Sequence, residues 1–194
     1  QLGLINLQRR QKYEPAVELL QQAAPRHTDP HHKARTLNHL GDAQWALSRH
    51  KEAIESYRQA IELDDNFAQP WNSVGDVLRL LNQPDEAINA YRRTIELAPD
   101  FAWPYHSLGL IYSHRGESNR TAYEAAITLF RQAIERHQTN RDRARAWNNL
   151  GSTYQALGRS SEAIKSFRQA IELDPAYTSP WHNLGGVYQS LNYP

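Results

Sequence analysis

The sequence predicts an all-α protein, an α-solenoid of antiparallel helix pairs, and two observations support this prediction. A unit of about 34 residues recurs in phase along the 194-residue chain, and each copy holds two runs of apolar residues spaced three and four apart. That spacing is the period of an amphipathic helix, and a fixed period of about 20–50 residues is typical of stacked repeats. Helix and turn alternate throughout, which leaves little room for strands.

Six segments follow one another along the chain. The copies 34–67, 68–101 and 144–177 are equal in length, whereas 102–143 has an insertion between its helices and a longer exit loop. The segment 1–33 supplies part of a repeat, mainly its second helix, and 178–194 supplies the first helix of a truncated repeat. Because the chain begins with Gln1 rather than Met and stops before a second helix, we expect a fragment of a longer protein.

A longer, 110-residue period overlies the short one. Under this shift 1–84 align with 111–194 without a gap, and 35 of the 84 pairs are identical. We therefore infer that the duplicated unit contained three repeats, including the longer copy. The polar segment 113–125 within that copy is expected to form an exposed loop.

One copy carries a complete family pattern at fixed offsets: Trp147, Leu150, Gly151, Tyr154, Ala163, Phe167, Ala170 and Pro175. This pattern resembles the tetratricopeptide repeat (TPR) family. The resemblance implies a right-handed superhelix whose first helices line a concave groove. It also implies a protein–protein interaction module that binds an extended peptide or partner segment in that groove.

The composition and the missing motifs argue against several other functions. The chain has no Cys, and its 22 Lys and Arg against 21 Asp and Glu give a net charge of +1, so no overall field favours nucleic acid or a membrane surface. There is no Gly-rich phosphate loop, HExxH or GxSxG motif. We expect no enzyme, no catalytic residue, no cofactor and no metal site. No signal peptide or membrane-length apolar run is seen, so we expect a cytoplasmic location.

The resemblance implies which residues face the groove. The fifth and sixth places of the first helices hold ten neutral hydrogen-bonding residues: Asn38, His39, Asn72, Ser73, His106, Ser107, Asn148, Asn149, His182 and Asn183. Solvated helix faces favour Glu, Lys and Arg, and Asn is a poor helix former, so we expect a functional row. The other expected groove residues are Arg35, Asp42, Asp76, Arg79, Trp103 and Arg145.

An Asn amide both donates and accepts, so a row of them can pair with the backbone of an extended peptide. The row is similar to the asparagine ladder of the O-linked N-acetylglucosamine transferase, and Asn149 and Asn183 occupy the ladder place. His39, Ser73 and Ser107 do not match the ladder. The fifth places lack Lys and the sixth places lack Arg, so the carboxylate clamp of chaperone-binding TPR proteins is not expected.

Several alternatives stay open. Asp42 and Asp76 indicate a preference for a basic ligand side chain, unless Arg79 pairs with one of them. Instead of a binding module, the chain can be a structural spacer or self-assembly element. Its end would then pair through Leu184, Val187, Tyr188 and Leu191. A third possibility is a substrate-recruiting arm of a larger enzyme, such as a glycosyltransferase or a signalling ATPase.

Overall fold

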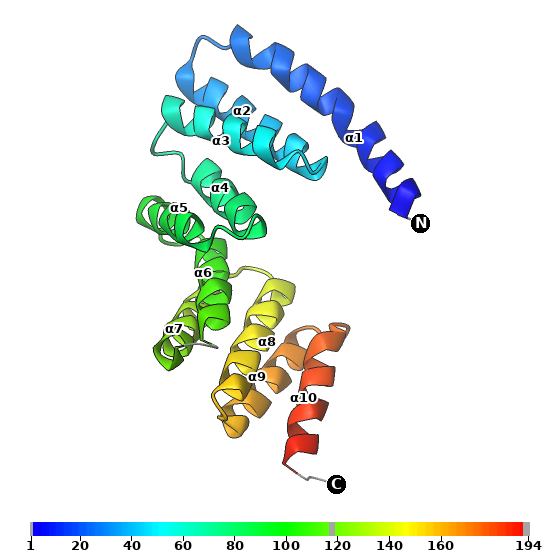
Figure 1. The fold of residues 1–194 in the computed structure, drawn as a ribbon, viewed down its shortest axis with the longest axis vertical. Coiled ribbons are helices and arrows are strands. Elements are labelled where there is room, and N and C mark those ends of the chain that lie inside the picture. Colours follow the sequence, from blue (N-terminus) through cyan, green and yellow to red (C-terminus); the bar gives the residue numbers. More distant parts are fainter. Residues whose placement is uncertain (1, 117–118, 192–194) are drawn as a thin grey trace. The chain divides into compact units, whose positions relative to one another are not determined.

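The computed structural model describes residues 2–116 and 119–191, with side chains from residue 11 onward (Figure 1). Within these ranges it contains helices and no strand, so the all-α prediction is confirmed. The chain forms two compact units, Gln1–Ala98 and Pro99–Pro194, called unit 1 and unit 2. The elements of unit 1 are α1 (Leu2–Ala23), the 3₁₀ turn η1 (Ala24–Arg26), α2 (Pro30–Ala46), α3 (His50–Leu63), α4 (Ala68–Leu80) and α5 (Pro84–Leu97). Those of unit 2 are α6 (Ala102–Arg115), α7 (Arg120–Arg136), α8 (Asn140–Ala156), α9 (Ser160–Leu173) and α10 (Thr178–Ser190).

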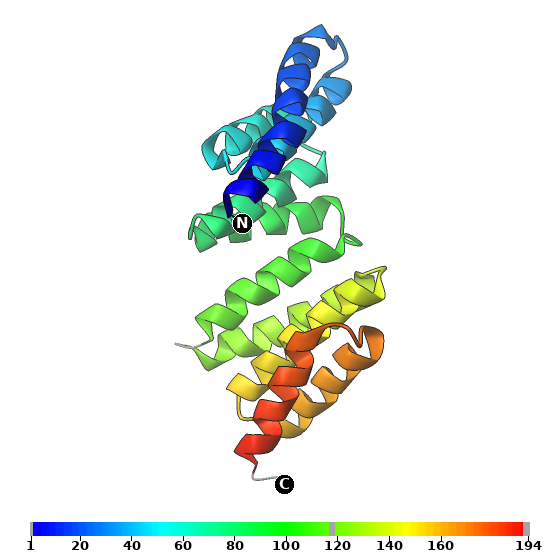
Figure 2. The ribbon, with the colours of Figure 1, turned by 90° about the vertical axis from the view of Figure 1, so that its right-hand side faces the viewer.

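Consecutive helices within each unit run antiparallel (Figures 1 and 2). In each complete pair, a glycine of the first helix lies under an aromatic ring of the second. A Cβ added to that glycine would come within 2.5–2.7 Å of the ring in Gly41–Tyr57, Gly75–Tyr91, Gly109–Phe130 and Gly151–Phe167. All four rings are fully buried. The two helices of a pair can approach this closely only because the first helix has no side chain at this place.

The turn inside a pair is tight and uses the left-handed backbone region. Ser48, Asn82 and Gly158 occupy the same place after their first helices, with φ of 62°, 59° and 73°. A residue of this conformation commonly ends a helix, and Gly and Asn adopt it at least cost. The second helix therefore starts within three residues and turns back along the first.

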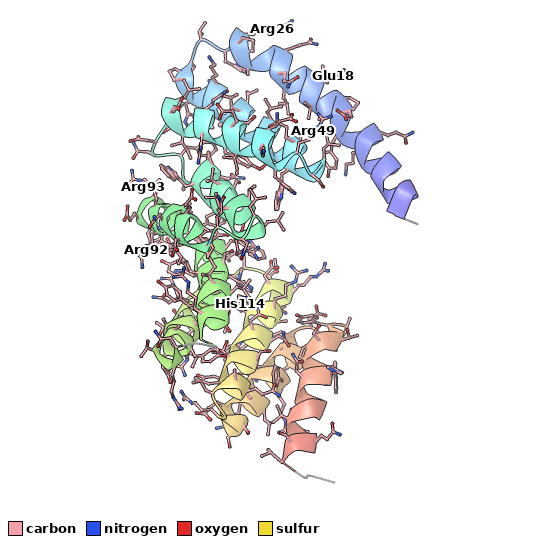
Figure 3. All side chains as sticks on the ribbon, in the orientation of Figure 1. Glu18, Arg26, Arg49, Arg92, Arg93 and His114 are labelled. Atoms are coloured by element: carbon pink, nitrogen blue, oxygen red, sulfur yellow. The ribbon has the colours of Figure 1, made fainter. Side chains whose placement is uncertain are left out.

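Two equivalent ion pairs join elements that are distant in sequence. Arg49, labelled in Figure 3, lies before α3 and its Nη2 is 2.6 Å from Glu14 Oε1 of α1. In unit 2 the Nη1 of Arg159 lies 3.4 Å from Glu124 Oε1 of α7. The two pairs are related by the 110-residue shift, so the longer period read from the sequence relates equivalent contacts in the two units.

The expected loop over 113–125 is mostly helical, which corrects that interpretation. α6 continues to Arg115, and α7 begins at Arg120 and runs for 17 residues, against 14 in α3, α5 and α9. Asn119 caps α7 by accepting a hydrogen bond from Thr121 N, so the inserted residues extend a helix. Residues 117–118 of this segment, and 192–194 of the last copy, lie outside the described residues.

The longer exit loop expected before residue 144 is also shorter than the sequence suggested. α8 begins at Asn140 because the Thr139 hydroxyl accepts a hydrogen bond from Asp142 N. Asp29 caps α2 in the same way, accepting from His32 N. The boundaries of the six repeat segments themselves stay a prediction from the sequence.

Candidate peptide-binding groove

Most residues at the fifth place are buried, which differs from the expected ligand-facing row. Asn38, Asn72, His106 and Asn148 are 1–8% exposed, and only His182 is exposed at this place. Ser107 at the sixth place is buried as well. The physical reason is that first helices of adjacent repeats pack against each other, as α2 does with α4 and α8 with α6 and α10. The fifth place lies in that contact.

In unit 2, amides of the sixth place bond to the fifth place of the preceding repeat. Asn149 Nδ2 donates to His106 Nε2 at 3.0 Å, and Asn183 Nδ2 donates to Asn148 Oδ1 at 3.0 Å. Asn149 and Asn183 are partly exposed. Each retains a second N–H and its Oδ1 without a partner among the described residues. The amides are thus held in one orientation, and one N–H and the Oδ1 of each stay available.

In unit 1, the two carboxylates expected in the groove bind buried tyrosines. Tyr57 Oη donates to Asp42 Oδ1 at 2.9 Å, and Tyr91 Oη donates to Asp76 Oδ1 at 2.7 Å. Burial raises the pKa of Tyr57 well above its ordinary value, and the charge of Asp42 adds to this, so the hydroxyl stays a donor. Arg79 is exposed and forms no ion pair with the described residues, so it does not neutralise either carboxylate.

The same acids also anchor the fifth-place amides. Asn38 Nδ2 donates to Asp42 Oδ2 at 3.4 Å, and Asn72 Nδ2 donates to Asp76 Oδ2 at 3.1 Å. The side chain of Asp42 is nevertheless 42% exposed. The Asp42 carboxylate therefore stabilises the fold through these hydrogen bonds, and its exposed part is accessible to a ligand.

A pairing rule in the sequence could have revealed this role. Where the ninth place is Asp, the twenty-fourth is Tyr; where the ninth is Leu110 or Ser152, the aromatic is Phe. A buried tyrosine hydroxyl needs an acceptor and a phenyl ring does not. The combination of Asp at the ninth place with Tyr at the twenty-fourth is therefore the sequence signal for this hydrogen bond.

The other expected groove residues are partly or fully exposed. Trp103 is 37% exposed and its ring lies 4.8 Å, centroid to centroid, from that of His137, which is buried. The Arg145 guanidinium lies 3.4 Å from Asp142. Arg35 is exposed and has no ion pair among the described residues. These side chains can contact a ligand without rearrangement.

Unit 1 also contains a pocket of about 770 Å³ between α1, α2 and the end of α4. Its lining is largely apolar and includes Tyr13, Ala16, Leu20, Trp45 and Leu80, with His39 and Asp42 at the polar side. Trp45 and Leu80 are 41% and 57% exposed. Polar and apolar groups therefore meet in one concave surface of this unit.

The described part of the chain has neither a metal-binding cluster nor a helix of the membrane-spanning kind. Across residues 2–116 and 119–191, no three His, Asp or Glu side chains are grouped so that they could bind a metal ion. Over the same ranges, no helix combines the length and the apolar character that a membrane crossing requires.

Comparisons with known proteins agree on the architecture. Family models described as tetratricopeptide repeat match residues 1–66 and 144–177, and a TPR repeat model matches 75–116. No curated protein matches the sequence.

Solved structures of similar fold include three TPR-like chains. A crystal structure of MamA is 22% identical, with 79% of this chain and 85% of that chain covered and a TM-score of 0.69. YrrB, described as a TPR protein with an unusual peptide-binding site, is 18% identical over 91% of this chain and 86% of that chain, with a TM-score of 0.70. The pilF protein of Pseudomonas aeruginosa is 18% identical over 82% and 69%, with a TM-score of 0.72. Identities this low establish similarity of fold alone. The family-model matches show that this chain belongs to the tetratricopeptide repeat family.

Proposed function

We propose that this chain is a protein-interaction module that binds an extended peptide segment along the first helices of unit 2. The observation that supports it is the pair of oriented amides, Asn149 and Asn183. Each donates one N–H to the neighbouring repeat and leaves a second N–H and an Oδ1 available. The two residues hold the same place in successive repeats.

An extended backbone presents N–H and C=O groups at regular intervals and in fixed directions. An amide that is already held by a neighbour loses little side-chain entropy when it binds such a group. Recognition through these amides does not depend on the ligand's side chains. Those side chains would be selected by Trp103, which offers a flat apolar surface, and by Arg145, which favours an acidic group.

The proposal assigns no reaction, cofactor or metal to this chain. YrrB has a similar fold, and its description mentions an unusual peptide-binding site. That property belongs to YrrB, and it supports only the view that a stack of this kind can hold a peptide.

A displayed library of random linear peptides provides a suitable probe. Fluorescence anisotropy measures the affinity of the selected peptides for the wild-type chain and for the double variant Asn149→Ala/Asn183→Ala. The double variant also removes the hydrogen bond that Asn183 donates to Asn148, so a second variant is needed that keeps this bond. Ser152→Trp fills the groove and breaks only the hydrogen bond from the Ser152 hydroxyl to the backbone carbonyl of Asn148. Gln169→Ala removes an exposed amide from α9 and is the matched control.

We expect both groove variants to weaken binding at least about tenfold and the control to bind like the wild type. The variants must keep the helical circular-dichroism signal of the wild type. A library that yields no binder overturns the proposal, and so do selected peptides that keep their affinity for both groove variants.

A further inference from the structure

In unit 2, an arginine of a second helix binds a tyrosine of the next first helix. Arg131 of α7 donates from Nη2 to Tyr154 Oη of α8 at 2.8 Å, and Arg168 of α9 donates from Nη2 to Tyr188 Oη of α10 at 2.7 Å. Both tyrosines hold the eleventh place of their copies. The ring of Tyr154 is 3% exposed, and the guanidinium carbon of Arg159 lies 4.7 Å from its centroid. The ring, its hydroxyl and the two guanidinium groups thus form one closed contact.

Unit 1 has the arginine of this contact but not the tyrosine. Arg58 of α3 holds the place of Arg131, and the eleventh place of the next copy is Leu78 of α4. At the place of Arg159 this copy has Gln83, so the covering guanidinium is missing as well. Arg58 is exposed and forms no hydrogen bond or ion pair with the described residues. Its guanidinium therefore lacks the phenolic acceptor that Arg131 has.

A pocket of about 400 Å³ lies at the corresponding place of unit 1. It is lined by α3, α4 and α5, with Arg58, Trp71 and Leu78 among the lining residues, and its volume is typical of a ligand site. The indole N–H of Trp71 donates to the backbone carbonyl of Asp65 at 3.2 Å, which fixes this wall of the pocket. A leucine side chain ends before the place where a tyrosine carries its hydroxyl. The pocket therefore contains the space, and Arg58 the donor, that Tyr154 uses in unit 2.

We propose that this pocket binds a tyrosine side chain of a partner protein, and that a Lys or Arg lies next to that tyrosine in the partner. The ring packs against Trp71 and Leu78. Arg58 donates to its hydroxyl oxygen, as Arg131 donates to Tyr154. The chain itself thus shows, in unit 2, which side chain fits a site of this construction.

Two acidic residues of the lining favour a basic segment around the tyrosine. Glu62 of α3 and Glu86 of α5 are exposed and form no ion pair with the described residues. With one Arg against two Glu, the charged part of the lining has one excess negative charge. A free phenol supplies no positive charge to match it, whereas a tyrosine flanked by Lys or Arg does.

The pocket lies on the other side of α4 from the residues expected in the groove. Trp71, Val74 and Leu78 follow the three- and four-residue spacing of one helix face, and Asn72 and Asp76 belong to the opposite face. The site is therefore a second binding surface, and it shares no residue with the one proposed for unit 2.

Capped tripeptides test the site on the 194-residue chain. The probes are Lys-Tyr-Lys, Lys-Phe-Lys and Glu-Tyr-Glu, with p-cresol as a free phenol. In a ¹⁵N correlation spectrum, the shift of the Trp71 indole N–H measures the affinity of each probe. We expect Lys-Tyr-Lys to bind at least about fivefold more tightly than Lys-Phe-Lys, because only tyrosine offers Arg58 an acceptor. Glu-Tyr-Glu and p-cresol should bind more weakly than Lys-Tyr-Lys, because neither complements the two acids.

Variants of the chain then test the role of each wall. Arg58→Gln removes the donor and should bind Lys-Tyr-Lys and Lys-Phe-Lys equally. Arg26→Gln is the matched control, because Arg26, labelled in Figure 3, is also exposed and forms no ion pair with the described residues. Leu78→Tyr supplies the tyrosine from α4 itself and should weaken the binding of Lys-Tyr-Lys at least about tenfold. The urea midpoint of Leu78→Tyr should exceed that of Leu78→Phe, because only the tyrosine accepts a hydrogen bond from Arg58.

The proposal is overturned if Lys-Tyr-Lys leaves the Trp71 resonance unchanged, or if Arg58→Gln still prefers tyrosine to phenylalanine. It is also overturned if p-cresol or Glu-Tyr-Glu binds as tightly as Lys-Tyr-Lys, since Glu62 and Glu86 then select nothing. None of these results depends on Asn149 and Asn183, so failure here leaves the peptide-binding proposal to be judged by its own experiment.

Discussion

Replacing Gly151 by Ala and Gly185 by Ala should change stability in opposite directions, although both glycines hold the same place in a first helix. A Cβ at residue 151 would lie 2.6 Å from Cε1 and 2.7 Å from Cδ1 of Phe167, whose ring is fully buried. Ordinary contact begins near 3.4 Å, so the ring must retreat by roughly 0.8 Å. At residue 185 the Cβ would meet nothing within 4 Å.

The expected magnitudes follow from two opposing effects. Overpacking a core typically costs about 1–3 kcal/mol, while Ala in place of Gly gains about 1 kcal/mol of helix propensity. Because the Phe167 ring has no open side, we expect Gly151→Ala to lose about 1–2 kcal/mol of unfolding free energy. Gly185→Ala should gain up to about 1 kcal/mol.

Urea denaturation followed by circular dichroism measures both changes. With a slope of about 2 kcal/mol per molar urea, Gly151→Ala should lower the midpoint by roughly 0.5–1 M. Gly185→Ala should raise it by up to roughly 0.5 M. The measurement uses dilute protein, so that association between chains does not affect the urea midpoints. If both variants shift the midpoint in the same direction, the close packing of Phe167 over Gly151 does not limit stability and the reasoning is refuted.

Two further predictions concern buried titratable groups. Burial raises the pKa of the Tyr57 hydroxyl in the folded chain, so above about pH 10 the hydroxyl ionises more readily in the unfolded chain. The free energy of unfolding, and with it the urea midpoint, should therefore fall as the pH rises past about 10. Tyr57→Phe should reduce that fall and cost about 1 kcal/mol at pH 7, since Asp42 loses its donor. Burial lowers the pKa of His137 below its ordinary value of 6.5; the charge of Asp142 opposes this shift and that of Arg143 adds to it. The contribution of a neutral His137 to the free energy of unfolding is therefore complete above pH 6.5 and decreases as the pH falls below 6.5. His137→Phe should narrow the difference in melting temperature between pH 7.5 and 5.5; an unchanged difference would contradict this account.

The sequence is sufficient for the helix pairs because their determinants are local and periodic. The glycine at the eighth place and the aromatic at the twenty-fourth mark a close approach, and Gly151 with Phe167 shows that contact in the structure. The apolar spacing identifies the inner face of each helix. These features make the all-α architecture predictable without knowledge of any neighbour.

The groove was less predictable, because a helical period shows which face is polar and not what covers it. Asn148 lies on a polar face, yet an adjacent first helix buries it and Asn183 hydrogen-bonds to it. The apolar period also does not reveal the caps Asn119 and Thr139, so it predicts a loop at residues 120–125 and 140–143, which are helical in the structure. Both caps are residue types that commonly begin helices, and the signal was therefore present.

The most direct test of groove binding is the side-chain amide spectrum of the chain with a library-selected peptide. In a ¹⁵N correlation spectrum, the NH₂ resonances of Asn149 and Asn183 should shift as the peptide is added, because their second N–H groups bind its backbone. The exposed amide of Asn89 on α5 should not move. If the peptide binds while the resonances of Asn149 and Asn183 stay unchanged, these amides do not contact the ligand and the proposed mode of recognition is wrong.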